Sequence, residues 1–589
     1  MSSSHKGSHL LVGLALFGLA FAAPLATMPA AQAAAAYTVT TQAEFVTALA
    51  DADPVINITM AADITLTESI VIPEGKTVSI TSDTGTRVLL RGAAMTGTTY
   101  VGPPCDSALI VAYGALTLTN IILDGNSVNM HAYSALVWGS WSINIGAGTV
   151  LRNNENIYET LAPASTQTAG GAIEMDDCAG DGTPCTVTIS GGDIYNNSAE
   201  VGGAIFVQDA TLTITGGKIH DNHAAQGGGV NLYAGSTGTM SGGEIYNNHA
   251  DLTAFALELD GAGVLVFGSS FTLSGGSIHD NTADHFGGGL AVVVGTGAAL
   301  TMTGGHIDDN SATDGGGIWF NADRTLPASI TGGTIDGNQA TTGNGGGINV
   351  LGPVHLHIGG TAQVSDNSSS EYGGGVFMSD VATVTIDGTA KLTGNQAGFD
   401  GGAIWLGEAY DNLSVAAGVV FANNLSQSAY FLNDPSLIAT HDAQIKTTKF
   451  SGGFQYGYNN YDINYRSDWP ANVVTFDSQG GSAVGPQPVA YNTAATAPHA
   501  PTKANAKFTN WCLDKACTQV YNFANPVTAD ITLYAGWQAT SGSGAPGPSL
   551  TPTGGQVVST TAPIAAGLFG MILLVGAAYW MRRKATLRY

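Results

Sequence analysis

The sequence GGDIYNNSAEVGGAI, over residues 191–205, contains the pattern that decides the fold. A second copy, GGHIDDNSATDGGGI, occupies residues 304–318. The same order of glycine pair, apolar residue, Asn-x-Ala turn and second glycine cluster recurs between residues 170 and 404, with a period of 25 to 34 residues. A repeat of this length predicts a solenoid, in which successive repeats stack and equivalent residues form columns.

Each repeat contains three short segments of strand-forming residues. The first alternates Thr with apolar residues, as in residues 211–215, and the second is very short and centred on an isoleucine such as Ile194. No helical segment separates the strands, so we predict an all-β parallel β-helix with three strands per coil over residues 37–450. The third segment follows the glycine cluster, and its expected inward positions are all apolar: Ile173, Met175, Ile205, Val207, Val230, Leu232, Val264, Val266, Leu290, Val292, Ile318, Phe320, Ile348, Val350, Val376, Met378, Ile404 and Leu406.

One asparagine recurs at the turn between the second and third segments. An asparagine at such a turn can adopt the left-handed conformation and stack its amide on that of the next coil. We therefore interpret the row as a structural ladder rather than a catalytic one. Its members are Asn197, Asn222, Asn248, Asn281, Asn310, Asn338, Asn367 and Asn395.

The pattern Ile-x-x-Asn-x-Ala followed by Gly-Gly-[Gly/Ala]-Ile resembles the short repeats of polymorphic outer-membrane proteins. More broadly, it resembles the pectin-lyase-like β-helix, and the resemblance covers about residues 37–450. It implies a right-handed helix and is far more specific for fold than for activity.

The two ends of the chain have the composition of targeting segments. Residues 1–33 read as a secretory signal peptide, with Lys6, an apolar run and an Ala-Gln-Ala site at residues 31–33. Residues 562–581 are mostly apolar and long enough to span a bilayer, and the basic tail 582–589 marks the cytoplasmic side. Residues 539–561 are rich in Gly, Ser, Pro and Thr and are expected to form a flexible stalk.

Within this stalk, residues 550–554 read Leu-Thr-Pro-Thr-Gly. They resemble the Leu-Pro-x-Thr-Gly sorting signal of Gram-positive wall proteins, with the proline one place late. The resemblance implies cleavage between Thr553 and Gly554 by a sortase and covalent attachment to peptidoglycan. The alternative is a plain membrane anchor.

A second domain is expected over residues 473–538. It begins with Val-Val-Thr-Phe-Asp-Ser-Gln-Gly-Gly at 473–481, continues through Phe-Thr-Asn-Trp at 508–511 and closes at Trp537. This segment closely resembles the internalin B-repeat, also called the Listeria–Bacteroides repeat, a small β-rich module of bacterial surface proteins. The resemblance implies a surface location and a spacer or adhesive role.

The charge of the chain restricts its partners. The net charge is −26, and removing the signal peptide and the basic tail leaves all 44 acidic residues with 13 of the 18 Lys and Arg residues, a net charge of −31. A surface this acidic disfavours nucleic acid as a partner. Neutral glycans, basic proteins and Ca²⁺ stay open, and no other cofactor is expected.

The five cysteines suit an exported protein. The pairs Cys178–Cys185 and Cys512–Cys517 have spacings that fit local disulfides, and Cys105 has no assigned role. Since the chain has no Cys-x-x-Cys pair, no metal site is predicted. His220, His279 and His306 could bind a metal, and the column Tyr195, His220, Tyr246 and His279 could line a sugar subsite, but exposed corner residues commonly have the same composition.

An enzyme reading depends on one corner of the rod. β-Helical lyases and hydrolases need paired carboxylates, or acidic residues and a base that meet in one groove. The candidates here are Asp308, Asp309 and Arg324, and the two aspartates also suit solvated turn positions.

The outward column of the third segment favours binding instead. It includes Phe206, Trp319, Phe377 and Trp405, which the core does not need. A row of outward aromatic residues predicts an exposed apolar stripe that contacts a ligand, unless long loops cover it.

We therefore expect a cell-surface adhesin or glycan-binding protein on the wall of a Gram-positive bacterium, whose partner is a glycan or a host surface protein. The alternatives are a β-helical polysaccharide lyase or glycoside hydrolase, and a structural surface stalk. Whether residues 100–165, which carry Trp138 and Trp141, form regular coils or an insertion stays open at this stage.

Overall fold

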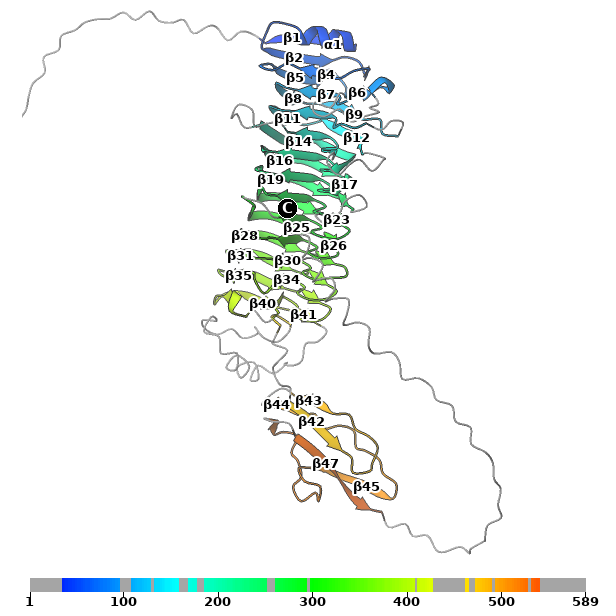
Figure 1. Ribbon diagram of the computed structural model, residues 1–589, viewed down its shortest axis with the longest axis vertical. Helices are drawn as coiled ribbons and strands as arrows, with labels where there is room; N and C mark the ends of the chain where they lie inside the picture. Colours follow the sequence, from blue (N-terminus) through cyan, green and yellow to red (C-terminus); the bar gives the residue numbers. More distant parts are fainter. Residues whose placement is uncertain are drawn as a thin grey trace, which may run out of the picture. The chain divides into compact units, whose positions relative to one another are not determined.

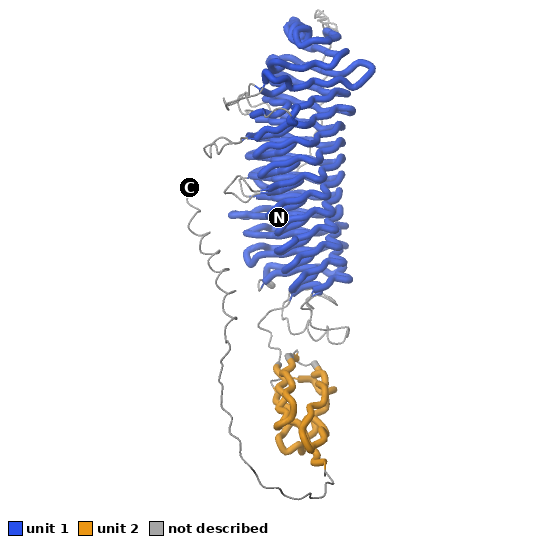
Figure 2. Tube along the Cα trace, turned by 90° about the vertical axis from the view of Figure 1, so that its right-hand side faces the viewer, with its two compact units in different colours: residues 1–469 blue, residues 470–589 orange. Residues whose placement is uncertain are grey.

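The computed structural model describes residues 34–95, 107–128, 132–157, 168–176, 185–251, 260–293, 297–407, 410–426, 461–464, 472–489, 493–527 and 531–540. The chain divides into two compact units between Trp469 and Pro470 (Figure 2). The first unit is a stack of β coils and the second is a small β module.

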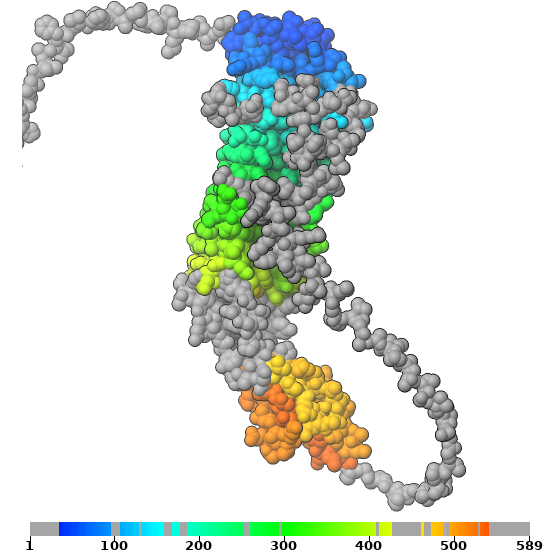
Figure 3. Space-filling view, viewed as in Figure 1, coloured from blue at the N-terminus to red at the C-terminus, as the bar shows by residue number. Residues whose placement is uncertain are grey.

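One face of the stack is a single parallel sheet of 12 strands among the described residues. Each strand pairs with its equivalent one coil further on, as Ile205 pairs with Val230. In sequence order the strands are β4 (Ile70–Ile72), β7 (Ile110–Ala112), β10 (Val137–Gly139), β13 (Ile173–Met175), β15 (Ile205–Gln208), β18 (Val230–Tyr233), β21 (Val264–Phe267), β24 (Leu290–Val293), β27 (Ile318–Asn321), β30 (Ile348–Leu351), β34 (Val376–Met378) and β38 (Ile404–Trp405). Figure 1 shows the stacked coils, and in Figure 3 the surface colours of the rod run in sequence order from blue through green to yellow-green.

The first and second segments of each coil form the other faces. At the two ends of the stack they are separate strands, as predicted: β1 (Ala35–Val39), β2 (Val55–Met60), β3 (Ile64–Leu66), β5 (Thr77–Ser82), β6 (Arg87–Arg91), β8 (Ala115–Leu118), β9 (Ile121–Asp124), β11 (Ser142–Ile145), β12 (Val150–Asn156), β31 (Val354–Ile358), β32 (Gln363–Ser365), β35 (Thr383–Ile386), β36 (Lys391–Thr393), β39 (Leu413–Val415) and β40 (Val420–Ala422).

In the middle coils the two segments join into one bent strand, which corrects the expected three separate strands. Each bend lies at a glycine pair whose second member has φ between 83° and 88°. At Gly217 a Cβ would lie 2.7 Å from the carbonyl oxygen of Gly191, so only glycine fits. The bent strands are β14 (Cys185–Val201), β16 (Ala210–His220), β19 (Thr237–Tyr246), β22 (Ser270–His279), β25 (Ala299–Asp308) and β28 (Leu326–Asp336).

From β16 onward, a short strand follows the turn after each bent or second strand. These strands are β17 (His223–Gln226), β20 (His249–Ala250), β23 (Thr282–Ala283), β26 (Ser311–Ala312), β29 (Gln339–Ala340), β33 (Ser368–Ser369), β37 (Gln396–Ala397) and β41 (Leu425–Ser426). They lead into the glycine cluster that precedes the 12-stranded sheet.

The core lies inside the coils, as the strand phase predicted. Every one of the eighteen inward positions of the third segment is fully buried, from Ile173 to Leu406. Removing this continuous apolar column from water is the main force that holds the coils together.

The asparagine row is the predicted ladder. The Nδ2 of Asn222 donates to Oδ1 of Asn248 at 3.0 Å and to the carbonyl of Ile194 in the preceding coil at 2.9 Å. The ladder also continues to Asn424 at the C-terminal end. The left-handed residue is the one before the asparagine, for example Asp221 with φ 53°, so the expected conformation was assigned one position too late.

A helix that the sequence analysis did not anticipate closes the N-terminal end of the core. Thr41 caps the N-terminus of helix α1 (Gln42–Leu49) and forms a capping box with Glu44. It buries Phe45, Ala48 and Leu49 next to β1–β4 (Figure 1).

The described parts of residues 100–165 are regular coils, which answers the question left open by the sequence. Strands β7 to β12 pair in register with those before and after them. Trp138 is 1% exposed and packs edge-on against Tyr113, whereas Trp141 is 39% exposed.

The second unit has its own core. A four-stranded sheet in the order β43 (Gln487–Val489), β42 (Asn472–Asp477), β47 (Ile531–Ala539) and β45 (Ala506–Cys512) accompanies a two-stranded pair, β44 (Thr493–Ala494) and β46 (Pro526–Val527). Val474, Phe476, Trp511 and Leu533 are buried between these strands.

Cys512 and Cys517 form the expected disulfide. Cys185 is also bonded in a disulfide, and its expected partner Cys178 lies outside the described residues, as does Cys105. The signal peptide, the sorting segment with Thr553 and Gly554, and the span 562–581 lie outside them too. Within the described ranges, no helix is both long and apolar enough to cross a bilayer.

Candidate binding groove

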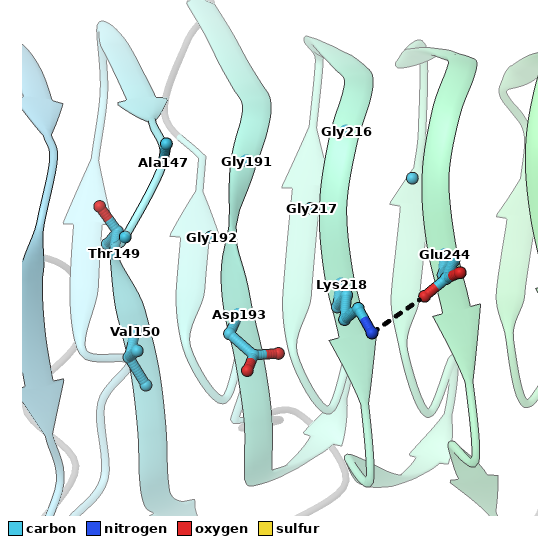
Figure 4. Close-up of a pocket in the computed structure, with 12 residues that line it drawn as sticks. Ala147, Thr149, Val150, Gly191, Gly192, Asp193, Gly216, Gly217, Lys218 and Glu244 are labelled. Atoms are coloured by element: carbon cyan, nitrogen blue, oxygen red, sulfur yellow. Dashed lines mark ion pairs between the residues drawn. The ribbon is translucent and has the colours of Figure 1, made fainter.

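The glycine bends leave a groove on the surface of the rod. Because consecutive coils place residues without side chains at the same corner, the backbone forms an open floor along the stack. The groove has a volume of about 660 Å³ and crosses four coils (Figure 4). Its lining residues are Ala147, Gly148, Thr149, Val150, Gly191, Gly192, Asp193, Gly216, Gly217, Lys218, Gly243 and Glu244.

One side of the groove is a row of charged side chains. Asp193 of β14, Lys218 of β16 and Glu244 of β19 are in register, since each is the first outward residue after its glycine pair. Lys218 Nζ lies 3.3 Å from Glu244 Oε2 (Figure 4), and this contact raises the pKa of Lys218. Both side chains stay about half exposed, so they remain available to a ligand.

A column of rings runs beside this charged row, two residues further along the same strands, and continues onto β22. Tyr195, His220, Tyr246 and His279 stack with centroid distances of 5.2, 4.7 and 5.0 Å. The ring of His220 is held between Asp221, 2.6 Å from Nδ1, and Asp193, 2.7 Å from Nε2.

Arg152 ends this column at Tyr195. Its Nη1 donates to the Tyr195 hydroxyl at 3.2 Å, and its Nε donates to Asp124 at 2.8 Å. The inner rings cover one another's faces, so only their edges and the tyrosine hydroxyls face outward. The carboxylates of Asp193 and Asp221 lie beside them. This wall therefore suits hydrogen bonding more than stacking of a flat ligand on a ring face.

The outward aromatic column of the 12-stranded sheet is mostly covered, and this corrects the expected exposed stripe. Trp319 is 0% exposed and Phe206 7%. Phe286 stacks on Trp319 at 4.4 Å, and Leu265 and Ala291 complete the cluster. Neither Trp319 nor Phe206 can stack against a ligand in this arrangement.

The C-terminal end of that column is partly open. Phe377 stacks on Trp405 at 4.7 Å, and Tyr372 lies 4.9 Å from Trp405. Phe399, beside Tyr372, is 43% exposed. Phe377 and Trp405 thus stay accessible as candidate ligand contacts.

The three candidate catalytic residues do not converge. Asp308 pairs with Asp336 at the end of β28, whereas Arg324 precedes the start of that strand and pairs with Asp323 at 3.2 Å. Asp308 accepts a hydrogen bond from Ser277 at 2.8 Å. Burial, and then the nearby Asp308, raises the pKa of Asp309.

Two aspartates, the fully buried Asp260 and the half-buried Asp314, have a structural role that the sequence analysis missed. Asp260 accepts hydrogen bonds from the backbone N–H groups of His285 and Phe286, at 2.7 and 3.2 Å, and its burial raises its pKa to about 6. Asp314 accepts from the N–H of Asn344 at 2.7 Å, and burial raises its pKa as well. Their common signal is an aspartate directly before the glycine cluster, at residues 260–263 and 314–317.

The histidines singled out from the sequence belong to different environments. His306 contacts Thr334 at 2.6 Å, and His279 contacts Asp280 at 2.7 Å. In the described part of the chain, neither belongs to a group of three side chains close enough to share a metal ion.

Comparison with known proteins supports the two-part architecture. Residues 135–331 match the family described as a right-handed beta helix region, and residues 473–536 match the Listeria–Bacteroides repeat domain. The chain therefore carries both of these elements. No solved structure matches it.

Two curated proteins of Evansella cellulosilytica share short segments with the chain. One, named a putative membrane protein, is 34% identical over 80 residues, which is 13% of this chain and 12% of that protein. The other, named a putative Gly-rich membrane protein, is 34% identical over 79 residues, 13% of this chain and 9% of that protein. The chain thus covers only about a tenth of the length of each relative.

Proposed function

We propose that this chain is a cell-surface adhesin that binds a neutral glycan along the glycine-bend groove. The observation that carries the proposal is the alignment of an open backbone floor with Asp193, Lys218 and Glu244, one from each of three consecutive coils. Parallel coils repeat about every 4.8 Å, so an extended polymer laid along the groove meets a new set of polar groups at each coil.

The chemistry of the groove favours a ligand rich in hydroxyl groups. Glu244 and Asp193 accept hydrogen bonds, Lys218 donates them, and the hydroxyls of Tyr195 and Tyr246 do both. The net charge of −31 outside the signal peptide and the tail disfavours a polyanion. A neutral polysaccharide satisfies both conditions.

Several observations support a surface location. The Listeria–Bacteroides repeat domain is a module of surface proteins, and the two relatives are named as membrane proteins. The sequence adds a signal peptide, the Leu550–Gly554 segment and the apolar span 562–581. We propose wall attachment by a sortase after Thr553. Release of the protein by a peptidoglycan hydrolase but not by detergent supports this, and release by detergent alone indicates the membrane anchor instead.

The binding experiment is a glycan array with the full-length chain, followed by measurement of affinity for the best ligand, with and without Ca²⁺. The double variant Lys218→Ala/Glu244→Ala should weaken binding about 10-fold or more, because hydrogen bonds to charged groups are lost. The matched control is Asp323→Ala/Arg324→Ala. It removes a similarly exposed ion pair, with Nε and Oδ1 3.2 Å apart, whose two residues do not line the groove. Neither double variant should change stability greatly, since exposed pairs contribute little.

Three results contradict the proposal. Unchanged binding in the groove variant excludes the groove. Loss of binding in Phe377→Ala/Trp405→Ala alone moves the site to the partly open aromatic cluster. Shortened or unsaturated glycan products indicate a hydrolase or lyase rather than an adhesin.

A further inference from the structure

Two histidines from neighbouring coils lie side by side on the short strands after the asparagine turn. His223 begins β17 and His249 begins β20, and the two residues pair in register. Their ring centroids are 5.4 Å apart. Both side chains are partly exposed, at 41% and 43%.

Two carboxylates approach these rings. Asp251 Oδ2 lies 3.0 Å from Nε2 of His223, and Asp284 Oδ1 lies 3.2 Å from Nε2 of His249. Asp251 directly follows β20 and Asp284 directly follows β23, so the group draws on three consecutive coils. Among the described residues, His223, His249 and Asp251 are the one group of three whose ligand atoms all lie within 4.8 Å of one another.

This donor set has the composition of a transition-metal site. Zinc binds imidazole nitrogen at about 2.0–2.1 Å and carboxylate oxygen at about 2.0–2.2 Å in a tetrahedral arrangement, so its ligand atoms lie roughly 3.4 Å apart. The three donor atoms here lie within 4.8 Å of one another, and these partly exposed side chains can close the difference by rotation about their χ angles. Two imidazoles among three ligands favour zinc over Ca²⁺, which prefers six or more oxygen ligands.

We propose that His223, His249 and Asp251 bind one zinc-class divalent cation, with a further coordination position open to solvent. A cation held by His223 and Asp251 replaces their direct contact of 3.0 Å between Nε2 and Oδ2. Asp284 acts as a positioning residue, because its contact with Nε2 of His249 orients that ring. The bound ion links adjacent coils at a corner where β17 and β20 otherwise share only a short backbone pairing.

The experiment uses the full-length chain, purified without a histidine tag and treated with a chelator. Isothermal titration with Zn²⁺ should give one site per chain, and Co²⁺ should give the visible spectrum of a site with nitrogen and oxygen ligands. His223→Gln and His249→Gln should each weaken Zn²⁺ binding more than about 100-fold, and Asp284→Asn about 10-fold, since outer partners contribute roughly 10–100-fold.

The matched control is His357→Gln. His357 is a similarly exposed histidine, 3.1 Å from Asp387, but its neighbours in the column are Ser329 and Thr385 rather than a second histidine. This variant should bind Zn²⁺ as the unchanged chain does. Zinc should also raise the thermal midpoint of the control but not that of His223→Gln, because binding stabilises only the state that holds the site.

The proposal is overturned if the unchanged chain binds no Zn²⁺, or if it binds Ca²⁺ and not Zn²⁺ at these residues. Equal binding by His223→Gln, His249→Gln and the control overturns it too, because the ion is then held elsewhere. Circular dichroism of each variant before titration shows that the β coils are intact, so a loss of binding reports on the site and not on the fold.

Discussion

At the scale of single residues, the buried polar side chains hold the turns that the apolar core cannot. Asn222 satisfies backbone groups in its own coil and in the preceding one, and its amide bonds to the next asparagine. A buried polar group stabilises a fold only when its partners are this complete. The ladder asparagines are therefore structural residues, and the functional search belongs on the outward columns.

Asp260 is the residue whose titration should affect stability. Its pKa is about 6 in the folded chain against 3.8 as the ordinary value, mainly because of burial. Between these two pH values the folded state binds more protons than the unfolded state, so the free energy of unfolding falls as pH rises from about 4 to about 6. Above about pH 6 the free energy of unfolding no longer changes through Asp260, and its total decrease is at most about 3 kcal/mol.

Replacing Asp260 by Asn removes this charge while keeping an oxygen that can accept from the N–H groups of His285 and Phe286. At pH 7.5 we expect Asp260→Asn to have a higher thermal midpoint than the unchanged chain. Near pH 4 the two midpoints should be equal. Asp323→Asn, at an aspartate that is 54% exposed, is the control and should show no such difference. A midpoint difference for Asp260→Asn that is equal at both pH values would contradict the assignment.

At the scale of the coil, the glycine pair decides both the bend and the groove. Gly217 and Gly75 both have positive φ, but a Cβ at Gly217 would meet a neighbouring backbone oxygen, whereas one at Gly75 would meet nothing within 4 Å. Gly75→Ala should lower the free energy of unfolding by about 1 kcal/mol, because alanine is strained in the left-handed conformation. Gly217→Ala should lower the free energy of unfolding by about 2–4 kcal/mol, because the bend and the adjacent backbone of Gly191 must both shift.

Thermal or urea unfolding of the two variants measures this difference. We expect the unchanged chain to be the most stable, Gly75→Ala to be less stable, and Gly217→Ala to be the least stable. Gly217→Ala should also weaken glycan binding, because the backbone of Gly191 and Gly217, which lines the groove, must shift to make room for the methyl group. If both variants lose the same free energy of unfolding, the close approach of consecutive coils is not the reason that the bend requires glycine.

The sequence pattern could predict what lies inside the coil but not what covers the outside. Alternation placed the eighteen inward residues correctly, because burial in a strand follows a period of two. The same alternation marked Trp319 as outward, and it is outward, yet Phe286 from the segment before β24 covers it. Such a contact depends on the path of a connecting segment, which has no period.

The groove was missed for a related reason. The glycine pairs were recognised as part of the repeat, but a column of residues without side chains becomes a groove only when the coils are in register. Helix α1 was missed because it is one short amphipathic segment outside the repeat. The outward positions of His223 and His249 were present in the repeat, but their pairing required the register of β17 with β20.

At the scale of the whole chain, the two units have separate cores. The main core of the rod, from Val39 to Ile463, is one cluster of buried residues, and the module has a separate core that includes Val474, Trp511 and Leu533. Because cooperative unfolding follows a shared core, the chain should unfold in two transitions rather than one. The disulfide between Cys512 and Cys517 lies in the module alone and offers a way to assign them.

The double variant Cys512→Ser/Cys517→Ser should therefore lower one transition and leave the other unchanged. Closing a loop of this length contributes about 2 kcal/mol through the entropy of the unfolded chain. Differential scanning calorimetry of the full-length chain measures both midpoints, and Gly217→Ala should lower only the other transition. If either variant lowered both transitions together, the module and the rod would share their stability, and the two cores would not unfold independently.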